Sequence, residues 1–279
     1  MITWLFAIFS SACSSMQSAF TKLGSKASSK SGAFSFNSFK TGSAFVIFML
    51  FALGGFTFHK STTAYASLYA LSQIVSAFCG YMALMKGSMA LSSLIASYSL
   101  VIPVIYGVAV LDENTYPIKM VGIALLLVSL FLLSKKGSKG KFEKSWVFYI
   151  ALTFLGNGIC SVIQKQHQII YPGLYIKEFT LISFGIIFIF FLAMAIFRKE
   201  KPQISSAKFS IPAGLAMGGM NFLTLALSQH MDASVLFPVV TVCSSVFNFI
   251  VSMLVFKEKF TKIQIGGIVL GIVSVILIK

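Results

Sequence analysis

The sequence predicts an all-α membrane protein with ten transmembrane helices. Three observations support this fold class: an apolar composition, apolar segments long enough to span a membrane, and an internal repeat. Hydrophobic residues make up 57% of the 279 positions and charged residues only 10%, whereas a soluble domain has about 25% charged residues. The net charge of +15 comes from lysines in short loops, which is typical of membrane topology and not of nucleic-acid binding.

Ten apolar segments are long enough to cross a bilayer as helices, which takes about 20 residues. The first lacks a basic stretch before it, so we expect a helix there and not a cleaved signal peptide. The segments are Ile2–Thr21, Ala33–Phe58, Ala64–Met85, Ala90–Leu111, Tyr116–Ser134, Trp146–Gln164, Glu178–Phe197, Phe209–Gln229, Ala233–Phe256 and Thr261–Ile278.

Two sequence echoes divide the chain into halves. GIALLLVSLFLLSK at 122–135 resembles GIVLGIVSVILIK at 267–279, and a CSxxQ pattern occurs at 13–17 and again at 160–164. Five spans are an odd number, so a second copy of the unit would be inverted in the membrane relative to the first. We therefore expect two inverted five-helix repeats, at 1–135 and 146–279, joined by a basic connecting loop at 136–145.

Each half ends in a helix, a short loop with an acid, and a last helix that contains glycine. These stretches read VIPVIYGVAVLDENTYPIKMVGIALLL at 101–127 and SVFNFIVSMLVFKEKFTKIQIGGIVLG at 245–271. The arrangement resembles the ten-helix EamA-like members of the drug/metabolite transporter superfamily, over essentially the whole chain. The resemblance implies an exporter or exchanger whose cavity is lined by the first four helices of each half. The sequence departs from the family pattern at Asn248, where a proline like Pro103 is favoured, and at Lys40, where arginine is common.

Polar side chains within the apolar segments are the candidates for substrate binding, because lipid leaves hydroxyls and amides without hydrogen-bond partners. In Ala233–Phe256 they recur at intervals of three and four, which places them on one helix face. For the serines and threonines the alternative is close helix packing. The candidates are Ser14, Gln17, Gln73, Tyr98, Asn157, Ser161, Gln164, Asn221, Thr241, Ser245 and Asn248.

Few ionisable residues lie near the predicted membrane core. Glu178 and Asp232 are candidates for proton coupling, although acids at a helix start also complement the helix dipole. Lys22, Lys40 and Lys165 lie at helix ends, where they either attract an anionic substrate or extend to the lipid headgroups.

These features predict a secondary transporter that moves a small polar metabolite by alternating access. Amides, hydroxyls and tyrosines favour a neutral or zwitterionic substrate such as an amino acid. Phosphorylated or nucleotide-linked metabolites, bound through the lysines, are the alternative. A passive channel, a lipid scramblase and an intramembrane enzyme are alternatives of another class. The sequence contains no catalytic motif, so we do not expect an enzyme.

The expected partners are the substrate and membrane lipids, with no nucleic acid. The chain is expected to be a monomer or a homodimer joined through the last helix of a repeat, as the resemblance implies. The four cysteines lack metal-binding spacing, so we expect no metal and no cofactor. Among the 22 basic residues only Arg198 is an arginine, which indicates an AT-rich genome and hence a bacterial cytoplasmic membrane.

The basic residues also predict the membrane orientation. The loops after the odd-numbered segments, with Lys40 counted in the first, carry 17 of the 22 lysine and arginine residues; the other loops and the C-terminus carry five. Lysine-rich loops stay in the cytoplasm, which places both termini outside, whereas the resemblance implies cytoplasmic termini. We favour external termini, because membrane insertion responds to charge directly.

Overall fold

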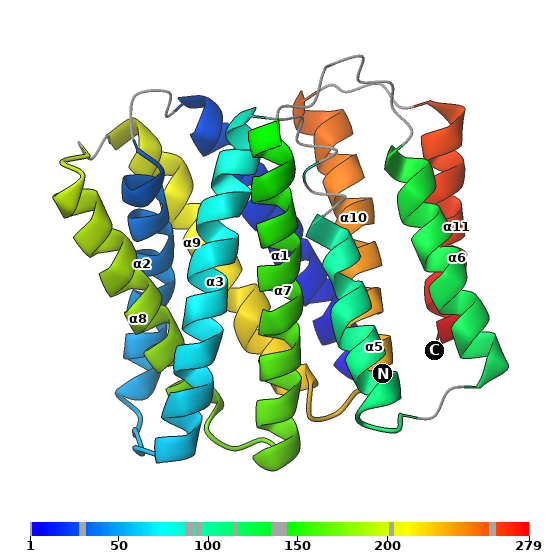
Figure 1. The fold of residues 1–279 in the computed structure, drawn as a ribbon, viewed down its shortest axis with the longest axis horizontal. Coiled ribbons are helices and arrows are strands. Elements are labelled where there is room, and N and C mark those ends of the chain that lie inside the picture. Colours follow the sequence, from blue (N-terminus) through cyan, green and yellow to red (C-terminus); the bar gives the residue numbers. More distant parts are fainter. Residues whose placement is uncertain are drawn as a thin grey trace.

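The computed structural model describes residues 2–27, 32–86, 92, 96–113, 116–134, 144–200, 204–256 and 261–278 (Figure 1). Within these ranges every regular element is a helix, as the sequence predicts. The elements are α1 (Ile2–Ala27), α2 (Ala33–Ala52), α3 (Lys60–Lys86), the 3₁₀ turn η1 (Tyr98–Leu100), α5 (Val101–Ala109), α6 (Pro117–Ser134), α7 (Lys144–Ile170), α8 (Ile176–Phe197), α9 (Ile204–Leu227), α10 (Ala233–Phe256) and α11 (Lys262–Ile278).

The described helices are those of a multi-pass membrane protein. Five of them are long and apolar enough to cross a membrane: α3, α7, α8, Ala207–Leu227 within α9 and Ala233–Val255 within α10. Large hydrophobic side chains such as Leu5, Leu71 and Phe148 are exposed on several helices. A surface this apolar needs lipid, since soluble monomers rarely expose large contiguous apolar patches.

Each predicted segment except the fourth overlaps one described helix. The second segment is predicted too long, because α2 ends at Ala52 and Gly55 adopts a positive φ of 124° before Phe58 is reached. The fourth, Ala90–Leu111, lies partly outside the described residues, and its described part is interrupted by η1 before α5 begins. A helix count of ten therefore stays a prediction.

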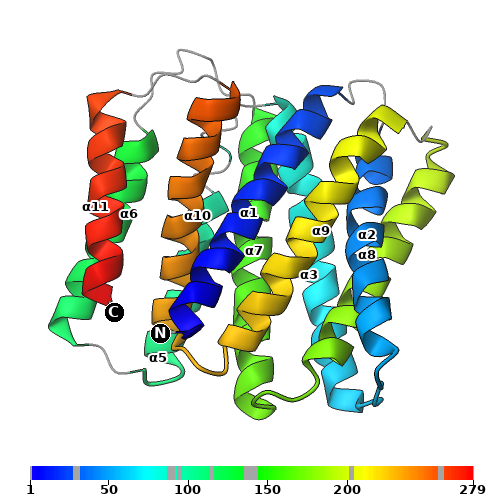
Figure 2. The same ribbon diagram turned by 180° about the vertical axis from the view of Figure 1, so that it is seen from behind.

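Helices that are far apart in sequence pack side by side (Figures 1 and 2). α1 packs against α9 and α10, α3 against α7 and α8, α2 against α8 and α9, and α5 against α10 and α7. α6 packs against α11 at one end of the molecule, where Ser129 Oγ donates a hydrogen bond to Gly267 O at 2.7 Å. The centre of the bundle is therefore formed by helices from both halves of the sequence.

Both ends of the described chain lie at one face of the bundle, which we call the termini face (Figure 1). The helix ends that flank the loops after α1, α6, α8 and α10 all lie at the opposite face. Those loops and the helix ends beside them contain most of the basic residues, so we call this the lysine-rich face. The position of both chain ends at one face agrees with an even number of membrane crossings.

The close approach of α2 and α9 depends on Gly214. A Cβ atom at this position would lie 1.8 Å from Lys40 O and 2.1 Å from Ser43 Oγ. Ser43 Oγ also joins the two helices, because it donates to Ile211 O at 3.1 Å. Small residues of this kind let membrane helices pack backbone to backbone.

Gly214→Ala should lower the melting temperature of the purified protein in detergent. The added methyl group meets a backbone carbonyl, which moves only if α2 moves, and overpacking of this kind costs about 1–3 kcal/mol. The matched control is Gly266→Ala in α11, because a Cβ there has nothing within 4 Å. Equal melting of the two variants would contradict the close contact.

A cysteine in the connecting loop tests the orientation. Ser138 lies outside the described residues, between α6 and α7. In intact cells, and with the native cysteines replaced by alanine, Ser138→Cys should resist a membrane-impermeant maleimide until the membrane is opened. Ser61→Cys, exposed at the termini-face end of α3, should react at once. The reverse pattern would place both termini in the cytoplasm.

Candidate functional site

A polar cavity of about 260 Å³ lies where α1, α3, α7, α9 and α10 meet around η1. We call it the central cavity. Amide and hydroxyl side chains make up most of its wall, and among the described residues that line it none carries a formal charge. The space is therefore suited to hydrogen bonding with a polar solute.

All but two of the predicted substrate-binding residues line the central cavity. The exceptions are Tyr98, whose hydroxyl donates to Leu127 O on α6 at 3.3 Å, and Ser245, whose hydroxyl donates to Thr241 O in its own helix at 2.8 Å. Substrate binding by the others stays a prediction, although the fold brings them together. The residues that line the cavity are Ser14, Gln17, Gln73, Asn157, Ser161, Gln164, Asn221, Thr241 and Asn248.

The rotation of α10 explains why Ser245 is missing from the cavity wall. Successive residues of a helix are turned by about 100°, so Phe237, Thr241, Ser244 and Asn248 fall within an arc of about 60°. All four line the cavity. Ser245 lies about 40° beyond Thr241, outside this arc. Intervals of three and four fit two neighbouring arcs equally well, so the sequence pattern does not distinguish Ser244 from Ser245.

Tyr98 is missing from the cavity wall for a different reason. It lies in η1, where a 3₁₀ turn advances about 120° per residue, so a projection based on the α-helix fails there. Ser97 and Ser99 on the same segment line the cavity instead. The sequence did not predict either serine as a lining residue, because no local pattern indicated the 3₁₀ turn.

Asn221 on α9 organises the polar groups of three helices. Its Oδ1 accepts hydrogen bonds from Tyr69 OH on α3 and, at 3.3 Å, from Gln164 Nε2 on α7. Its Nδ2 donates to Met217 O of its own helix at 2.9 Å. These bonds fix the orientation of the cavity wall before any solute binds, which is what a selective site requires.

Asn248 brings an unpaired hydrogen-bond acceptor to the cavity wall. Its Oδ1 is buried and has no hydrogen-bond partner among the described residues. A buried acceptor left unpaired costs about 1–3 kcal/mol, and in a cavity wall such an atom points to a donor on a ligand. Binding of a hydroxyl or ammonium group by Asn248 stays a prediction.

A second compartment of about 160 Å³ adjoins the central cavity. The two share Gln17, Gln73 and Asn157 among their lining residues. The second compartment also contacts Thr21 and Lys40, which lie in the parts of α1 and α2 nearer the lysine-rich face. Together the two compartments form a polar path from the centre toward that face.

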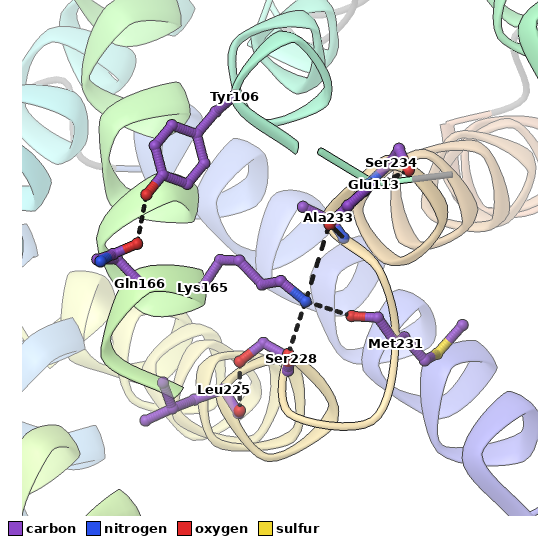
Figure 3. A network of polar contacts seen from close by, with 9 residues as sticks. All are labelled: Tyr106, Glu113, Lys165, Gln166, Leu225, Ser228, Met231, Ala233 and Ser234. Atoms are coloured by element: carbon purple, nitrogen blue, oxygen red, sulfur yellow. Dashed lines mark hydrogen bonds and ion pairs between the residues drawn. The ribbon is translucent and has the colours of Figure 1, made fainter. Parts of the chain in front are cut away.

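At the termini face, Lys165 joins α7 to the turn between α9 and α10 (Figure 3). Its Nζ donates to Ser228 O at 3.1 Å and to Met231 O at 2.8 Å, and it lies 3.9 Å from Glu113 Oε1. The Lys165 and Glu113 side chains are only 9% and 6% exposed. The ammonium group therefore makes buried contacts here and does not extend to the lipid headgroups.

Glu113 caps the N-terminus of α10 across the two halves of the chain. Its Oε1 accepts from Ala233 N at 2.7 Å, and its Oε2 accepts from Ser234 N at 2.9 Å and from Ser234 Oγ. A carboxylate at this position satisfies free backbone N–H groups and complements the helix dipole. Its role was not foreseen, because the cap is formed by a residue 120 positions away.

Neither candidate for proton coupling lines the central cavity or the second compartment. Glu178 lies at the start of α8, where its Oε1 accepts from Thr57 N at 3.2 Å and from Thr57 Oγ1 at 2.9 Å. Asp232 is exposed just before α10. Proton transfer by either residue stays a prediction.

Residues 144–279 match the EamA-like transporter family. The second half of the chain is an EamA-like transporter domain. The resemblance seen in the sequence is thereby confirmed for this half, and a match to a family of transporters is consistent with the expectation that the protein is not an enzyme. The EamA-like domain supplies α7, α9 and α10 to the central cavity, whereas α1, α3 and the η1 segment come from the first half.

Other comparisons extend the likeness of fold to the whole chain. No curated protein matches the sequence, whereas 28 chains of solved structures match the fold. One of them, described only as a crystal structure of a protein, has a TM-score of 0.70 at 14% sequence identity. The match covers 99% of this chain and 94% of the other. At this identity the likeness shows the fold alone.

Glu113→Gln should lower the melting temperature, because it removes the charge that faces Lys165 and weakens the cap of α10. Removing one partner of a buried ion pair costs about 3–5 kcal/mol; we expect the lower part of this range, since two carbonyl groups still accept from Lys165. The control is Asp112→Asn, an exposed neighbour with a φ of 49°, which asparagine tolerates.

A double variant separates the charge from the cap. Adding Lys165→Met to Glu113→Gln should recover part of the lost melting temperature, because no uncompensated charge is then left buried. If Glu113→Gln alone melted like the wild type, the network would have no structural role.

Proposed function

We propose that the protein is a secondary transporter that exports or exchanges a small neutral or zwitterionic metabolite, such as an amino acid. The observation that carries this proposal is the central cavity, walled by uncharged amides and hydroxyls in a chain whose second half is an EamA-like domain. Polar groups are costly to bury in a membrane protein. A polar solute that binds in this space accounts for the position of these groups around it.

The size of the cavity supports a small substrate. Pockets for drug-sized ligands measure about 300–1,000 Å³, and the central cavity has about 260 Å³. An amino acid or a metabolite of similar size suits this volume. The absence of charge among the described lining residues also disfavours a phosphorylated substrate.

We further propose that the two halves are inverted repeats and that transport proceeds by alternating access. If the two halves are exchanged, the pairing of α1 with α9 becomes that of α7 with α3. In the same way, the pairing of α2 with α9 becomes that of α8 with α3, and the pairing of α1 with α10 becomes that of α7 with α5. All of these pairings occur. Gln17 and Gln164, from the repeated CSxxQ pattern, both line the central cavity, which also supports the proposal.

The described conformation corresponds to one stage of that cycle. Glu113 and Lys165 hold the termini face together, and the polar path leads from the centre toward the lysine-rich face. With the lysine-rich face in the cytoplasm, this is a state closed to the outside. Access from outside would require the contacts of Lys165 with the turn between α9 and α10 to open.

Solute counterflow tests the proposal against a channel and a scramblase. A thermal-shift screen of amino acids, quaternary amines, nucleosides and sugar phosphates selects solutes for proteoliposomes. A transporter should give saturable uptake of labelled solute that is accelerated by the same solute inside the vesicles. Flux without saturation would indicate a channel, and lipid exchange without solute flux would indicate a scramblase.

Asn248→Leu should reduce counterflow by about 2- to 10-fold, and by more if the bound donor is charged, while leaving the melting temperature within a few degrees of the wild type. The leucine removes a cavity acceptor that makes no bond to the protein through Oδ1, so binding suffers more than folding; one lost hydrogen bond is worth about 0.5–1.5 kcal/mol, or more with a charged partner. The matched variant is Ser245→Ala on the same helix, whose hydroxyl bonds within α10. Equal loss of transport and stability in Asn248→Leu would favour a packing role.

A further inference from the structure

Lys40 is the one charged side chain among the described residues that line the central cavity and the second compartment. It lies in α2, and the residue is only 4% exposed. Its ammonium group makes no hydrogen bond and no ion pair with the described residues. A buried cation without a partner is costly, so its presence in a cavity wall needs an explanation.

Lys165 shows how this chain accommodates a buried lysine that has a structural role. Its Nζ donates to Ser228 O and Met231 O and faces Glu113. Lys40 has no comparable set of acceptors among the described residues, although it is buried to a similar extent. Extension of Lys40 to the lipid headgroups does not explain it either, since the residue is buried and lines the second compartment.

The backbone of Lys40 is held in place from two sides. Lys40 O accepts a hydrogen bond from Ser43 Oγ at 2.9 Å. It also lies so close to Gly214 that a Cβ there would come within 1.8 Å. The side chain of Lys40 therefore extends from a fixed backbone position, as a preorganised binding group should.

Gln17 is a second side chain that could donate a hydrogen bond to a ligand near Lys40. It lines both compartments, and its side chain makes no hydrogen bond with the described residues. An ammonium and an amide N–H group suit the two oxygens of a carboxylate, because hydrogen bonds to a charged partner are the strong ones. Gln17 also lines the central cavity, whose wall contains Asn248 with its unpaired Oδ1.

We propose that Lys40 binds a carboxylate of the transported solute, so that the substrate is a small monocarboxylate with hydrogen-bond donors, such as a zwitterionic amino acid. This inference rests on the transport function proposed above. One lysine balances one negative charge. A phosphate dianion would bring a second charge that no described lining residue compensates, so it is a poorer ligand.

Matched pairs of acids and amides test the carboxylate directly. The probes are L-alanine, L-serine and L-lactate, each paired with its primary amide, together with inorganic phosphate. Binding is measured as the shift in melting temperature, and transport as counterflow in proteoliposomes. In the wild type, at least one acid should bind better than its amide and better than phosphate.

Substitutions at Lys40 assign that preference to its charge. Lys40→Gln should weaken binding of the acid by about 10- to 100-fold, which corresponds to a charged hydrogen bond, and bring acid and amide to similar affinity. Lys40→Arg should keep the preference for the acid. The matched control is Lys177→Gln, an exposed lysine at the start of α8, which should behave as the wild type.

The melting temperature without any probe gives an independent readout. Lys40→Gln should melt above the wild type, because it removes a buried charge that has no partner. Melting at or below the wild-type temperature would mean that the ammonium group has a structural role, and would overturn the proposal. The same conclusion follows if acid and amide bind the wild type equally, if no probe binds, if phosphate binds best, or if Lys40→Gln keeps the preference for the acid.

The two measurements separate this inference from the function on which it rests. Counterflow of acids and amides at equal rates would support transport and refute the role of Lys40. Lys40-dependent binding of an acid without counterflow would support the carboxylate site and refute transport. Lys40-dependent binding together with counterflow of the same acid supports both.

Discussion

The constraint on which this structure depends is that polar groups inside a membrane find their partners within the protein, because lipid offers none. The amides and hydroxyls of α1, α3, α7, α9 and α10 therefore turn inward and meet around one space. Asn221 illustrates the result, since its side chain joins Tyr69 and Gln164 from two other helices. The outer faces are left to large apolar side chains such as Leu5 and Phe148.

The same constraint explains how much could be predicted from the sequence. The fold class and most of the cavity wall follow from which polar residues interrupt apolar segments, because such residues cannot face lipid. Contacts between residues of the two halves could not be predicted in this way. The contact of Glu113 with Ser234 links residues that no local pattern connects. Tyr98 and Ser245 show the limit within one segment, where a 3₁₀ turn or a few tens of degrees of helix rotation decides whether a side chain faces the cavity.

Two buried lysines illustrate opposite uses of one residue type. Lys165 is surrounded by acceptors and an acid, so its charge is compensated within the protein and holds helices together. Lys40 has no such surroundings among the described residues and contacts the second compartment. From the sequence both are lysines near helix ends. Only the position of neighbouring oxygens distinguishes a stabilising charge from one that is available to a ligand.

The cap that Glu113 places on α10 has a kinetic consequence for the proposed cycle. Because it crosses from the first half of the chain to the second, the halves separate at the termini face only when the carboxylate leaves the helix end. Its strength therefore enters the equilibrium between the two access states, and each 1.4 kcal/mol, roughly, changes their ratio tenfold. A stronger cap would slow the return of the empty carrier, and a weaker one would let the cavity open to both sides of the membrane. In the proposed cycle, a helix cap would therefore also contribute to the pace of turnover and to the seal across the membrane.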